Sequence, residues 1–377
     1  MNDNKIFLSF AIPTYNRDSF LEKLLTSILP QVEEFKGDVE VCIYNNSSTD
    51  NTRQVVETFI KKYPGIIKYQ ENNTGSPNHD NVINLSKMTS GNFVWFFGDD
   101  DSIIPKGFKE VVDFIKKNSR KNTGLVVLKD ESYFIDKKTG EKIIYYSSLE
   151  PNRPLSFKID RKNIIGANFP DCSFMSVLIF NNDFLKPTLE QEKGLIEKAK
   201  GEGNIFEFLY RLMFLKHSKI EGITFNKKIV LQEMPYYKYY IEDKFRHAYV
   251  GKKRMNDLLK RCGYATGDDI GVLNAENKKL RKNVVQHIIM MKTFKTFRLR
   301  SSYTEVLKSF LKQAGLWDGL RISAVFLLIY ITPSFFLQNA LKFYFFLKYG
   351  KNRETHWLFC ETIHSRVSQG TREVNLE

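Results

Sequence analysis

Five short apolar runs recur through the first 130 residues, with helical patterns between them. The runs are Ile6–Ile12, Val39–Ile43, Ile66–Tyr69, Phe93–Phe97 and Gly124–Leu128. Apolar residues at helical spacing lie between them, over residues 18–28, 52–60 and 81–88. This alternation predicts an α/β fold, a mostly parallel sheet flanked by helices on both faces. In such sheets ligands bind beyond the carboxyl ends of the strands, so we expect the functional site there.

An acidic cluster, Gly98-Asp99-Asp100-Asp101, follows the fourth of these runs. Adjacent carboxylates repel one another unless a cation or hydrogen-bond donors compensate. A divalent ion bound to a diphosphate would do so, and hard oxygen ligands suit Mg²⁺ or Mn²⁺. The cluster therefore predicts a metal site at Asp99, Asp100 and Asp101. The alternative is a polar turn that caps the next helix.

Three further polar loops follow the other predicted strands. They are Pro13–Arg17, Asn45–Thr52 and Asn72–Gly75, and the glycine of the last permits close backbone approach. Each alone is an ordinary turn. Together with the aspartates, they place four polar loops on one edge of one sheet, which predicts a binding site.

The order and spacing of these motifs resembles the family 2 glycosyltransferases with the GT-A fold, over Ile6 to about Leu128. Residues 11–17 look like the family's opening strand and nucleotide loop. Residues 45–50 stand where the family usually has Asp-Asp-Gly-Ser-Thr-Asp, and residues 73–81, Gly91 and the aspartates follow in the usual order. The Gly-Asp-Asp-Asp form and the C-terminal end look most like bacterial surface-polysaccharide enzymes, including abequosyltransferase-like ones.

The resemblance implies an inverting enzyme that moves a sugar from a nucleotide-sugar donor to a glycan acceptor, which we expect to be lipid-linked. Thr14, Tyr15 and Asn46 would contact the nucleoside, and the aspartates would hold Mn²⁺ or Mg²⁺ against the donor diphosphate. The full set of expected donor-binding residues is Pro13, Thr14, Tyr15, Arg17, Asn45, Asn46, Asn73, Gly75, Asn81 and Asp99.

The chain departs from the family's pattern at three places. Asn45 and Asn46 replace two aspartates, which leaves the base of the nucleotide open because an amide both donates and accepts. Gly98 stands where the family has its first Asp, which makes Asp100 the first metal candidate, although a shift of one would pair Asp99 with Asp101. The usual Glu-Asp pair on the acceptor side is not cleanly present. The candidates for the catalytic base are Glu202, Glu207 and Asp171.

The C-terminal part of the chain carries much of the formal net charge of +14. Between Lys278 and Arg353 the acidic residues are Glu305 and Asp318 alone, so this part attracts polyanions. No recognised nucleic-acid motif accompanies the charge, so we expect an anionic membrane surface as partner and no nucleic acid. The uncharged stretch Ile322–Leu341 contains Pro333, and aromatic residues follow it, which favours helices lying in the interface over one that crosses. A buried helical hairpin is the alternative.

These observations divide the chain into three predicted parts. Residues 1–130 would be the nucleotide-sugar-binding half of a GT-A domain, 131–250 its acceptor-side half, and 251–377 a helical, basic, membrane-associating region. The amino terminus shows no secretory signal, and the four cysteines are far apart, so we expect a reducing cytoplasmic setting at the inner membrane face.

Two other classes of function stay open at this point. A metal-dependent sugar nucleotidyltransferase would also use carboxylates on an α/β sheet, but residues 13–17 are not a Gly-rich triphosphate loop. A non-enzymatic binder of nucleic acid or lipid would need only the basic half. The histidines share no ligand spacing, so zinc is not expected.

Overall fold

The computed structural model describes residues 5–72, 81–135, 142–168, 174–200, 204–233 and 251–279, together with Ile331, Thr332, Phe336 and Asn339. Its contacts divide the chain into two compact units. The first comprises residues 1–201, 205–234 and 259–272, and the second comprises residues 202–204, 235–258 and 273–377. The predicted donor and metal residues fall in the first unit, whereas the base candidate Glu202 falls in the second.

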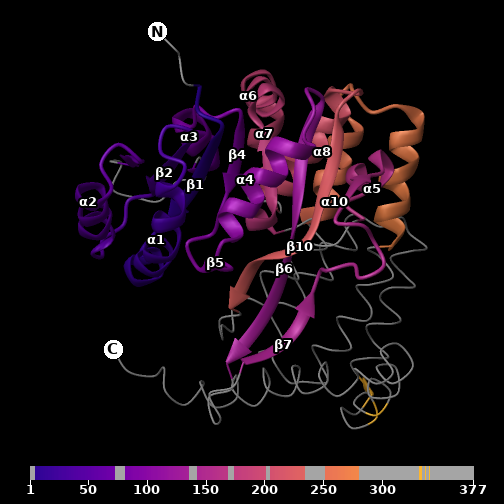
Figure 1. Ribbon diagram of the computed structural model, residues 1–377. Helices are drawn as coiled ribbons and strands as arrows, with labels where there is room; N and C mark the ends of the chain where they lie inside the picture. The colour runs from indigo at the N-terminus through magenta and orange to yellow at the C-terminus, as the bar shows by residue number, and fades with distance from the viewer. Residues whose placement is uncertain are drawn as a thin grey trace. The chain divides into compact units, whose positions relative to one another are not determined.

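The described part of the first unit is built on a ten-stranded sheet (Figure 1). The strands are β1 (Leu8–Thr14), β2 (Val39–Asn45), β3 (Ile67–Glu71), β4 (Phe93–Phe96), β5 (Asp101–Ile103), β6 (Thr123–Ile135), β7 (Lys142–Ser147), β8 (Ser156–Ile159), β9 (Leu178–Asn181) and β10 (Glu221–Glu233). The main path runs β3-β2-β1-β4-β9-β6-β10-β5, with β7 paired to β6 and β8 to β10. Strands β3, β2, β1, β4, β6 and β10 share one direction and the other four oppose it, so the predicted mostly parallel sheet is confirmed.

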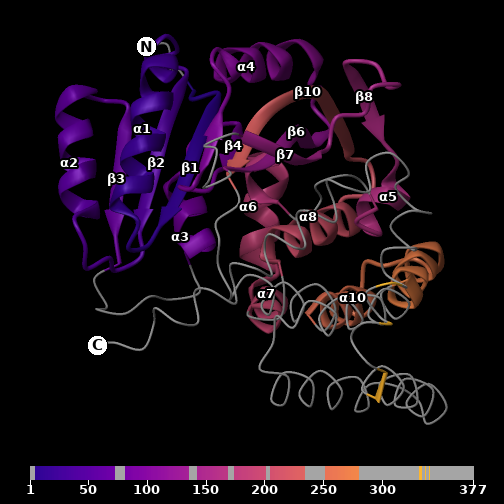
Figure 2. The ribbon, with the colours of Figure 1, turned by 90° about the horizontal axis from the view of Figure 1, so that it is seen from below.

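Helices cover both faces of this sheet, as Figure 2 shows. They are α1 (Asp18–Glu33), α2 (Thr52–Lys62), α3 (Asn81–Met88), α4 (Gly107–Asn118), α5 (Arg161–Ile165), α6 (Asn182–Gln191), α7 (Lys193–Ala199) and α8 (Ile205–Lys216), with a 3₁₀ turn η1 at Met175–Val177. Helices α1, α2 and α4 lie on one face, and α3, α6 and α8 lie on the other. The helices expected near residues 18, 52 and 81 are all present.

Adjacent side chains of β4 show how the two layers are filled, because successive residues of a strand point to opposite faces. Trp95 stacks on Phe108 of α4 with ring centroids 5.8 Å apart and meets the edge of Phe10. Phe96 points the other way and packs on Phe206 of α8, at 5.1 Å. The aromatic surplus of the chain therefore fills the core on both sides of this central strand.

Strand β9 joins the parallel part of the sheet to the rest. It runs antiparallel to β4, with Trp95 opposite Ile179, and antiparallel to β6, with Val127 opposite Leu178. Strand β6 itself passes through the predicted boundary at residue 130. One continuous sheet thus carries residues from both predicted halves of the GT-A domain.

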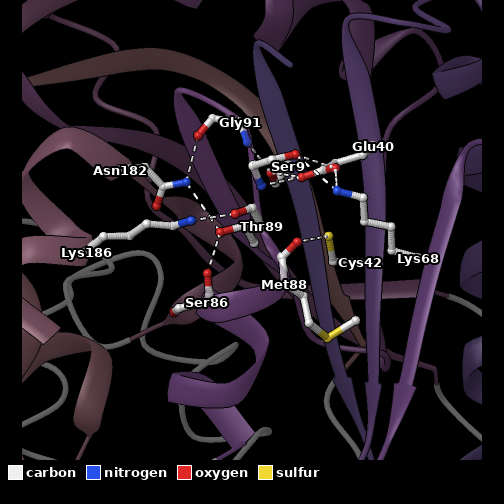
Figure 3. A network of polar contacts seen from close by, with 11 residues as sticks. Ser9, Glu40, Cys42, Lys68, Ser86, Met88, Thr89, Gly91, Asn182 and Lys186 are labelled. Atoms are coloured by element: carbon white, nitrogen blue, oxygen red, sulfur yellow. Dashed lines mark hydrogen bonds and ion pairs between the residues drawn. The ribbon is translucent and has the colours of Figure 1, made fainter. Parts of the chain in front are cut away.

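A buried polar network ties together the amino ends of the first four strands (Figure 3). The carboxylate of Glu40 on β2 accepts a hydrogen bond from Ser9 Oγ at 2.6 Å and pairs with Lys68 Nζ at 2.6 Å. It also accepts from the backbone N–H of Ser90, at 2.6 Å. The N–H of Gly91 donates to Ser9 Oγ, and a Cβ at Gly91 would lie 2.6 Å from the Ser9 nitrogen. This network fixes the strands at the edge opposite the predicted site.

The same network extends to α6 (Figure 3). Asn182 Nδ2 donates to the carbonyl of Gly91 at 2.7 Å, and Lys186 Nζ donates to the carbonyl of Thr89 at 2.5 Å. Cys42 is buried nearby and unbridged, and burial raises the pKa of its thiol far above the ordinary range. This thiol stays protonated and unreactive at neutral pH.

In the second unit, the described contacts are helical. Asn256 Nδ2 donates to Asn277 Oδ1 at 2.8 Å, and Lys252 pairs with Glu276 at 3.0 Å, which joins α10 (Lys252–Lys260) to residues 273–279. No helix among the described residues is both long and apolar enough to cross a bilayer. The predicted membrane segment, residues 322–341, lies outside them except at four positions.

Candidate functional site

The loops that follow β1 and β4 meet at the carboxyl edge of the sheet, as the sequence predicted. Thr14, the last residue of β1, donates from Oγ1 to Asp99 Oδ2 at 2.8 Å. The guanidinium of Arg17 reaches the same carboxylate, with 2.8 Å between its NH1 and Asp99 Oδ1. The same nitrogen lies 2.8 Å from Asp100 Oδ2. Four of the predicted donor and metal residues therefore form one contact group.

The two carboxylates that share Arg17 differ in burial. The side chain of Asp99 is 5% exposed, whereas that of Asp100 is 33% exposed. Burial raises the pKa of Asp99 to about 6, although the Arg17 guanidinium acts to lower it. Asp100 is the more open of the two, and its role as the first metal candidate stays a prediction.

Asp101 turns away from this pair and into the protein. It begins β5, lies opposite Gln232 of β10, and accepts a 2.5 Å hydrogen bond at Oδ2 from Ser176 Oγ. Burial raises the pKa of Asp101 well above its ordinary value, and the negative charge of Asp100 adds to the effect. Asp101 therefore acts in this structure as an internal anchor of the loop.

Steric crowding explains why the chain has Gly98 at the position where the family has an Asp. A Cβ there would lie 2.6 Å from Asp101 Oδ2 and 2.9 Å from Asp100 Oδ1. The space that a side chain would need is filled by the carboxylates that follow. The shape of this loop therefore accounts for the glycine that replaces the family's first Asp.

The donor set fits a divalent cation that is shared with a phosphate ligand. Among the described residues, no three Asp, Glu, His or Cys side chains converge to hold a metal ion by themselves. Mg²⁺ and ions like it are commonly held by one or two carboxylates together with substrate phosphates. Asp99 and Asp100 already converge on one positive group and supply oxygen ligands of the right kind.

The loop after β2 lies beside the β1 loop and faces the end of β3. The backbone N–H of Asn46 donates to the Thr14 carbonyl at 2.9 Å, and Asn46 Oδ1 accepts from Asn72 Nδ2 at 3.1 Å. Asn45 is fully buried, and its Nδ2 donates to the hydroxyl of Tyr69 at 2.8 Å. Of the two amides that replace aspartates, Asn45 therefore supports the loop and Asn46 lies against the β1 loop.

Two non-glycine residues in these loops adopt left-handed backbone conformations. Asn16 has φ of 50° and Ser47 has φ of 68°. The loops clamp each other, because the Asn16 N–H donates to Ser48 Oγ at 2.9 Å and Asn16 Oδ1 accepts from the N–H of Thr49 at 2.7 Å. Such strain persists where surrounding contacts over-determine it, and it concentrates at ligand sites. Tyr15, the neighbour of Asn16 in the chain, is 43% exposed.

The remaining donor candidates are Pro13, Asn73, Gly75 and Asn81. Asn73 and Gly75 lie outside the described residues. Asn81 begins α3, and its Oδ1 accepts from the N–H of Val82 at 2.9 Å. Pro13 lies within β1, opposite Tyr44 of β2.

Of the three base candidates, only Glu207 lies among the described residues; Asp171 and Glu202 do not. Glu207 is buried on α8, and its Oε1 accepts from Arg211 NH1 at 2.7 Å. Arg211 is also buried, and its Nε donates to the Ile165 carbonyl at 2.7 Å. A buried pair with this geometry is typical of a structural role, so the catalytic role of Glu207 stays a prediction.

Sequence reasoning missed two residues beside the aspartates. Ser176 lies in η1, where its hydroxyl holds Asp101. Asp130 on β6 is 2% exposed, and among the described residues its Oδ1 has no hydrogen-bond partner. Its negative charge also helps to raise the pKa of Asp101, after burial, Asp100 and Asp99. The one sequence signal for Asp130 is an acidic residue two positions after the apolar run that ends at Leu128.

Comparison with protein-family models decides which family this site belongs to. Residues 9–184 match the model described as Glycosyl transferase family 2. The chain contains a family 2 glycosyltransferase domain. The match covers the site, β1 to β9 and the start of α6, and it favours the glycosyltransferase prediction over the nucleotidyltransferase and the non-enzymatic binder.

Curated relatives of this glycosyltransferase domain act in several bacteria. Abequosyltransferase RfbV of Salmonella typhimurium is 38% identical over 98 residues, which cover 26% of this chain and 29% of that protein. The minor teichoic acid biosynthesis protein GgaA of Bacillus subtilis is 24% identical over 233 residues, 58% of this chain and 50% of that protein. The chain thus spans half or less of the length of these relatives.

Solved structures show that the glycosyltransferase domain has the GT-A fold. Staphylococcus aureus TarS, residues 1–349, superposes with a TM-score of 0.54 at 17% identity, over 97% of this chain and 92% of that chain. The mannosyltransferase PcManGT from Pyrobaculum calidifontis, solved with GDP-Man and Mn²⁺, gives 0.53 at 14% identity, over 97% of this chain and 87% of that chain. At these identities the likeness concerns the fold alone.

Proposed function

We propose that the protein transfers a sugar, with inversion, from a nucleotide-sugar donor to a glycan acceptor in the synthesis of a bacterial surface polysaccharide. The observation that carries this proposal is the convergence of Thr14 and Arg17 on Asp99 and Asp100. It occurs inside a family 2 glycosyltransferase domain, at the sheet edge where α/β proteins bind their ligands.

The donor would lie across the loops that follow β1, β2 and β4. Asn46 and the exposed ring of Tyr15 would contact the nucleoside, and Asp99 and Asp100 would hold Mn²⁺ or Mg²⁺ against the diphosphate. When bound, such a cation stabilises negative charge on the departing nucleotide. Mn²⁺ accompanies the donor in the mannosyltransferase that shares this fold, which supports the choice of metal.

An acceptor hydroxyl would attack the anomeric carbon of the donor sugar from the side opposite the diphosphate. A carboxylate base would take the proton of that hydroxyl. Glu202, Asp171 and Glu207 remain the proposed candidates for that base. Relatives of the domain support a glycan acceptor that is carried on a lipid. One of them is a Campylobacter jejuni glucosyltransferase named for a GalNAc(5)-diNAcBac-PP-undecaprenol substrate, 38% identical over 99 residues and 30% of that protein.

The membrane surface belongs to this proposal as the place where such an acceptor is found. We propose that the basic C-terminal part binds peripherally to the cytoplasmic face of the inner membrane. Ile331 and Phe336, two apolar residues of the uncharged stretch, are each 64% exposed, which supports contact with lipid. The test is sedimentation with anionic vesicles at low salt, compared with zwitterionic vesicles. Equal and negligible binding to both would overturn this part.

The experiment that tests the donor site is calorimetric titration with UDP, dTDP, GDP and CDP, with and without Mn²⁺. The wild type is compared with Asp100→Asn, which keeps the size of the side chain and removes its charge. We expect one nucleotide to bind in a Mn²⁺-dependent way and the variant to lose that dependence. A folded wild type that binds no nucleotide would overturn the proposed function.

A further inference from the structure

One nitrogen of Arg17 holds two carboxylates that a divalent cation would need. Its NH1 lies 2.8 Å from Asp99 Oδ1 and 2.8 Å from Asp100 Oδ2, and the Arg17 side chain is 45% exposed. The guanidinium therefore reaches the acidic pair from the solvent side. Asp99, by contrast, is held from within by the Thr14 hydroxyl.

We propose that Arg17 is an internal counter-ion that competes with the divalent cation for Asp99 and Asp100 and moves to the donor diphosphate when both bind. This inference rests on the proposed function, because it assigns a role to one residue of the same donor site. Its consequence is that cation and nucleotide bind with positive coupling, each strengthening the binding of the other.

The competition follows from charge and geometry. Two adjacent carboxylates, one of them buried, are costly without a positive partner, and Arg17 supplies it. A cation of the Mg²⁺ type binds carboxylate oxygens at about 2.0–2.1 Å, so it would compete with the guanidinium for Asp99 Oδ1 and Asp100 Oδ2. In this proposal, binding of the cation alone displaces Arg17 from these oxygens and leaves it without an anion.

The donor diphosphate gives the displaced Arg17 a new anionic partner. A guanidinium matches the geometry of phosphate oxygens and binds them with two parallel hydrogen bonds. Arg17 lies directly before α1, and its half-exposed side chain leaves it free to change rotamer. The centre of the Phe20 ring lies 6.0 Å from the guanidinium carbon, and Phe20 is itself 43% exposed. Thr14 keeps Asp99 in place while Arg17 moves.

The test measures Mn²⁺ affinity by calorimetry, first without nucleotide and then with a saturating amount of the nucleotide that binds the wild type. The variant is Arg17→Gln, and the matched control is Lys116→Gln. Lys116 is also exposed and paired with an aspartate, Asp38, at the opposite edge of the sheet. Both substitutions remove one positive charge from the surface, and a thermal melt verifies that each variant is folded.

For the wild type and Lys116→Gln we expect nucleotide to strengthen Mn²⁺ binding about tenfold or more. For Arg17→Gln we expect Mn²⁺ alone to bind several-fold more tightly than in the wild type. The strengthening by nucleotide should shrink to the part that direct contact between the cation and the diphosphate supplies. Nucleotide binding in Mn²⁺ should weaken in the same variant, because the diphosphate loses its arginine.

The outcomes separate this inference from the proposed function. If the wild type binds nucleotide but Arg17→Gln leaves both Mn²⁺ affinity and the coupling unchanged, the counter-ion role is wrong and the donor site stands. If the wild type binds no nucleotide with or without Mn²⁺, the donor site is wrong and the coupling is overturned with it.

Discussion

The hydroxyl of Ser176 lies 2.5 Å from Oδ2 of Asp101, across 75 positions of sequence. The same hydroxyl accepts the N–H of Gly98 at 2.9 Å, and the Ser176 carbonyl accepts from Trp95 Nε1 at 2.7 Å. One serine thus connects the end of β4, the start of β5 and the turn before β9. It sets the shape of the loop that presents Asp99 and Asp100.

Removing this hydroxyl should loosen the acidic loop. In Ser176→Ala, the carboxyl group of Asp101 and the N–H of Gly98 lose their partner while they remain buried. We expect the free energy of unfolding to fall by about 1–3 kcal/mol in urea titrations. Ser102→Ala is the control, since that hydroxyl makes a long contact of 3.4 Å to the Leu231 carbonyl and none shorter among the described residues. Equal stability of the two variants would contradict the role given to Ser176.

A methyl group at position 98 should disturb the site more than the fold. Gly98→Ala places a Cβ within 2.9 Å of carboxylate oxygens of both Asp100 and Asp101, so the aspartates must move. We expect Mn²⁺-dependent nucleotide binding to weaken about tenfold or more, because catalytic and binding groups tolerate little displacement. The matched control is Gly194→Ala on α7, where nothing lies within 4 Å of the added methyl. The idea fails if calorimetry finds both variants binding like the wild type.

Replacement of Glu207 should separate a structural from a catalytic role. Glu207→Gln removes the carboxylate that pairs with the buried guanidinium of Arg211, and breaking a buried pair of this kind costs about 3–5 kcal/mol of unfolding free energy. The structure thus predicts a large loss of stability. The fraction of the variant that is folded should bind nucleotide as the wild type does. A stable Glu207→Gln variant with unchanged nucleotide affinity and a collapsed turnover would instead identify Glu207 as the base.

The buried carboxylate of Glu40 should make stability depend on pH. Burial alone would raise the pKa of Glu40, but Lys68, Ser9 and Ser90 together hold it below its ordinary value. An acid with a lowered pKa in the folded state stabilises the protein above its unfolded pKa of about 4.3, and this stabilisation is lost as pH falls through the folded value.

The measurement for Glu40 is the unfolding free energy of the wild type and of Glu40→Gln at neutral pH and at several acidic values. The advantage of the wild type should be full at neutral pH and shrink as the pH drops below the unfolded pKa. A difference that stays constant with pH would mean that the charge of Glu40 plays no part in the network.

The core of the site could be predicted from sequence because parallel strands end at one edge. Thr14 and Asp99 lie 85 positions apart, yet each follows an apolar run, and β1 and β4 are neighbours in the sheet. The pattern needed no knowledge of side-chain geometry. The same pattern of apolar residues also predicts the first strands and helices, because their periodicity is regular.

What escaped prediction depends on contacts between distant segments. Strand β5 has three residues and starts inside the acidic cluster, so no periodicity marks it. Strand β10 alternates poorly, since Lys227 and Lys228 interrupt it at a shift of register against β6. The bond between Ser176 and Asp101 follows from where η1 packs, and no local pattern in either segment encodes it.

The antiparallel position of β9 between β4 and β6 has a consequence for how the protein is made. During synthesis, β4 and β6 leave the ribosome well before Leu178–Asn181 do, and until then neither strand has its neighbour on that side. Two unpaired strand edges invite association with other chains. Unpaired strand edges would therefore be exposed in a nascent chain stalled before residue 178, or in a fragment cut to the first 130 residues for expression. Such a chain would be prone to aggregate, and we expect a chaperone to bind it at these edges.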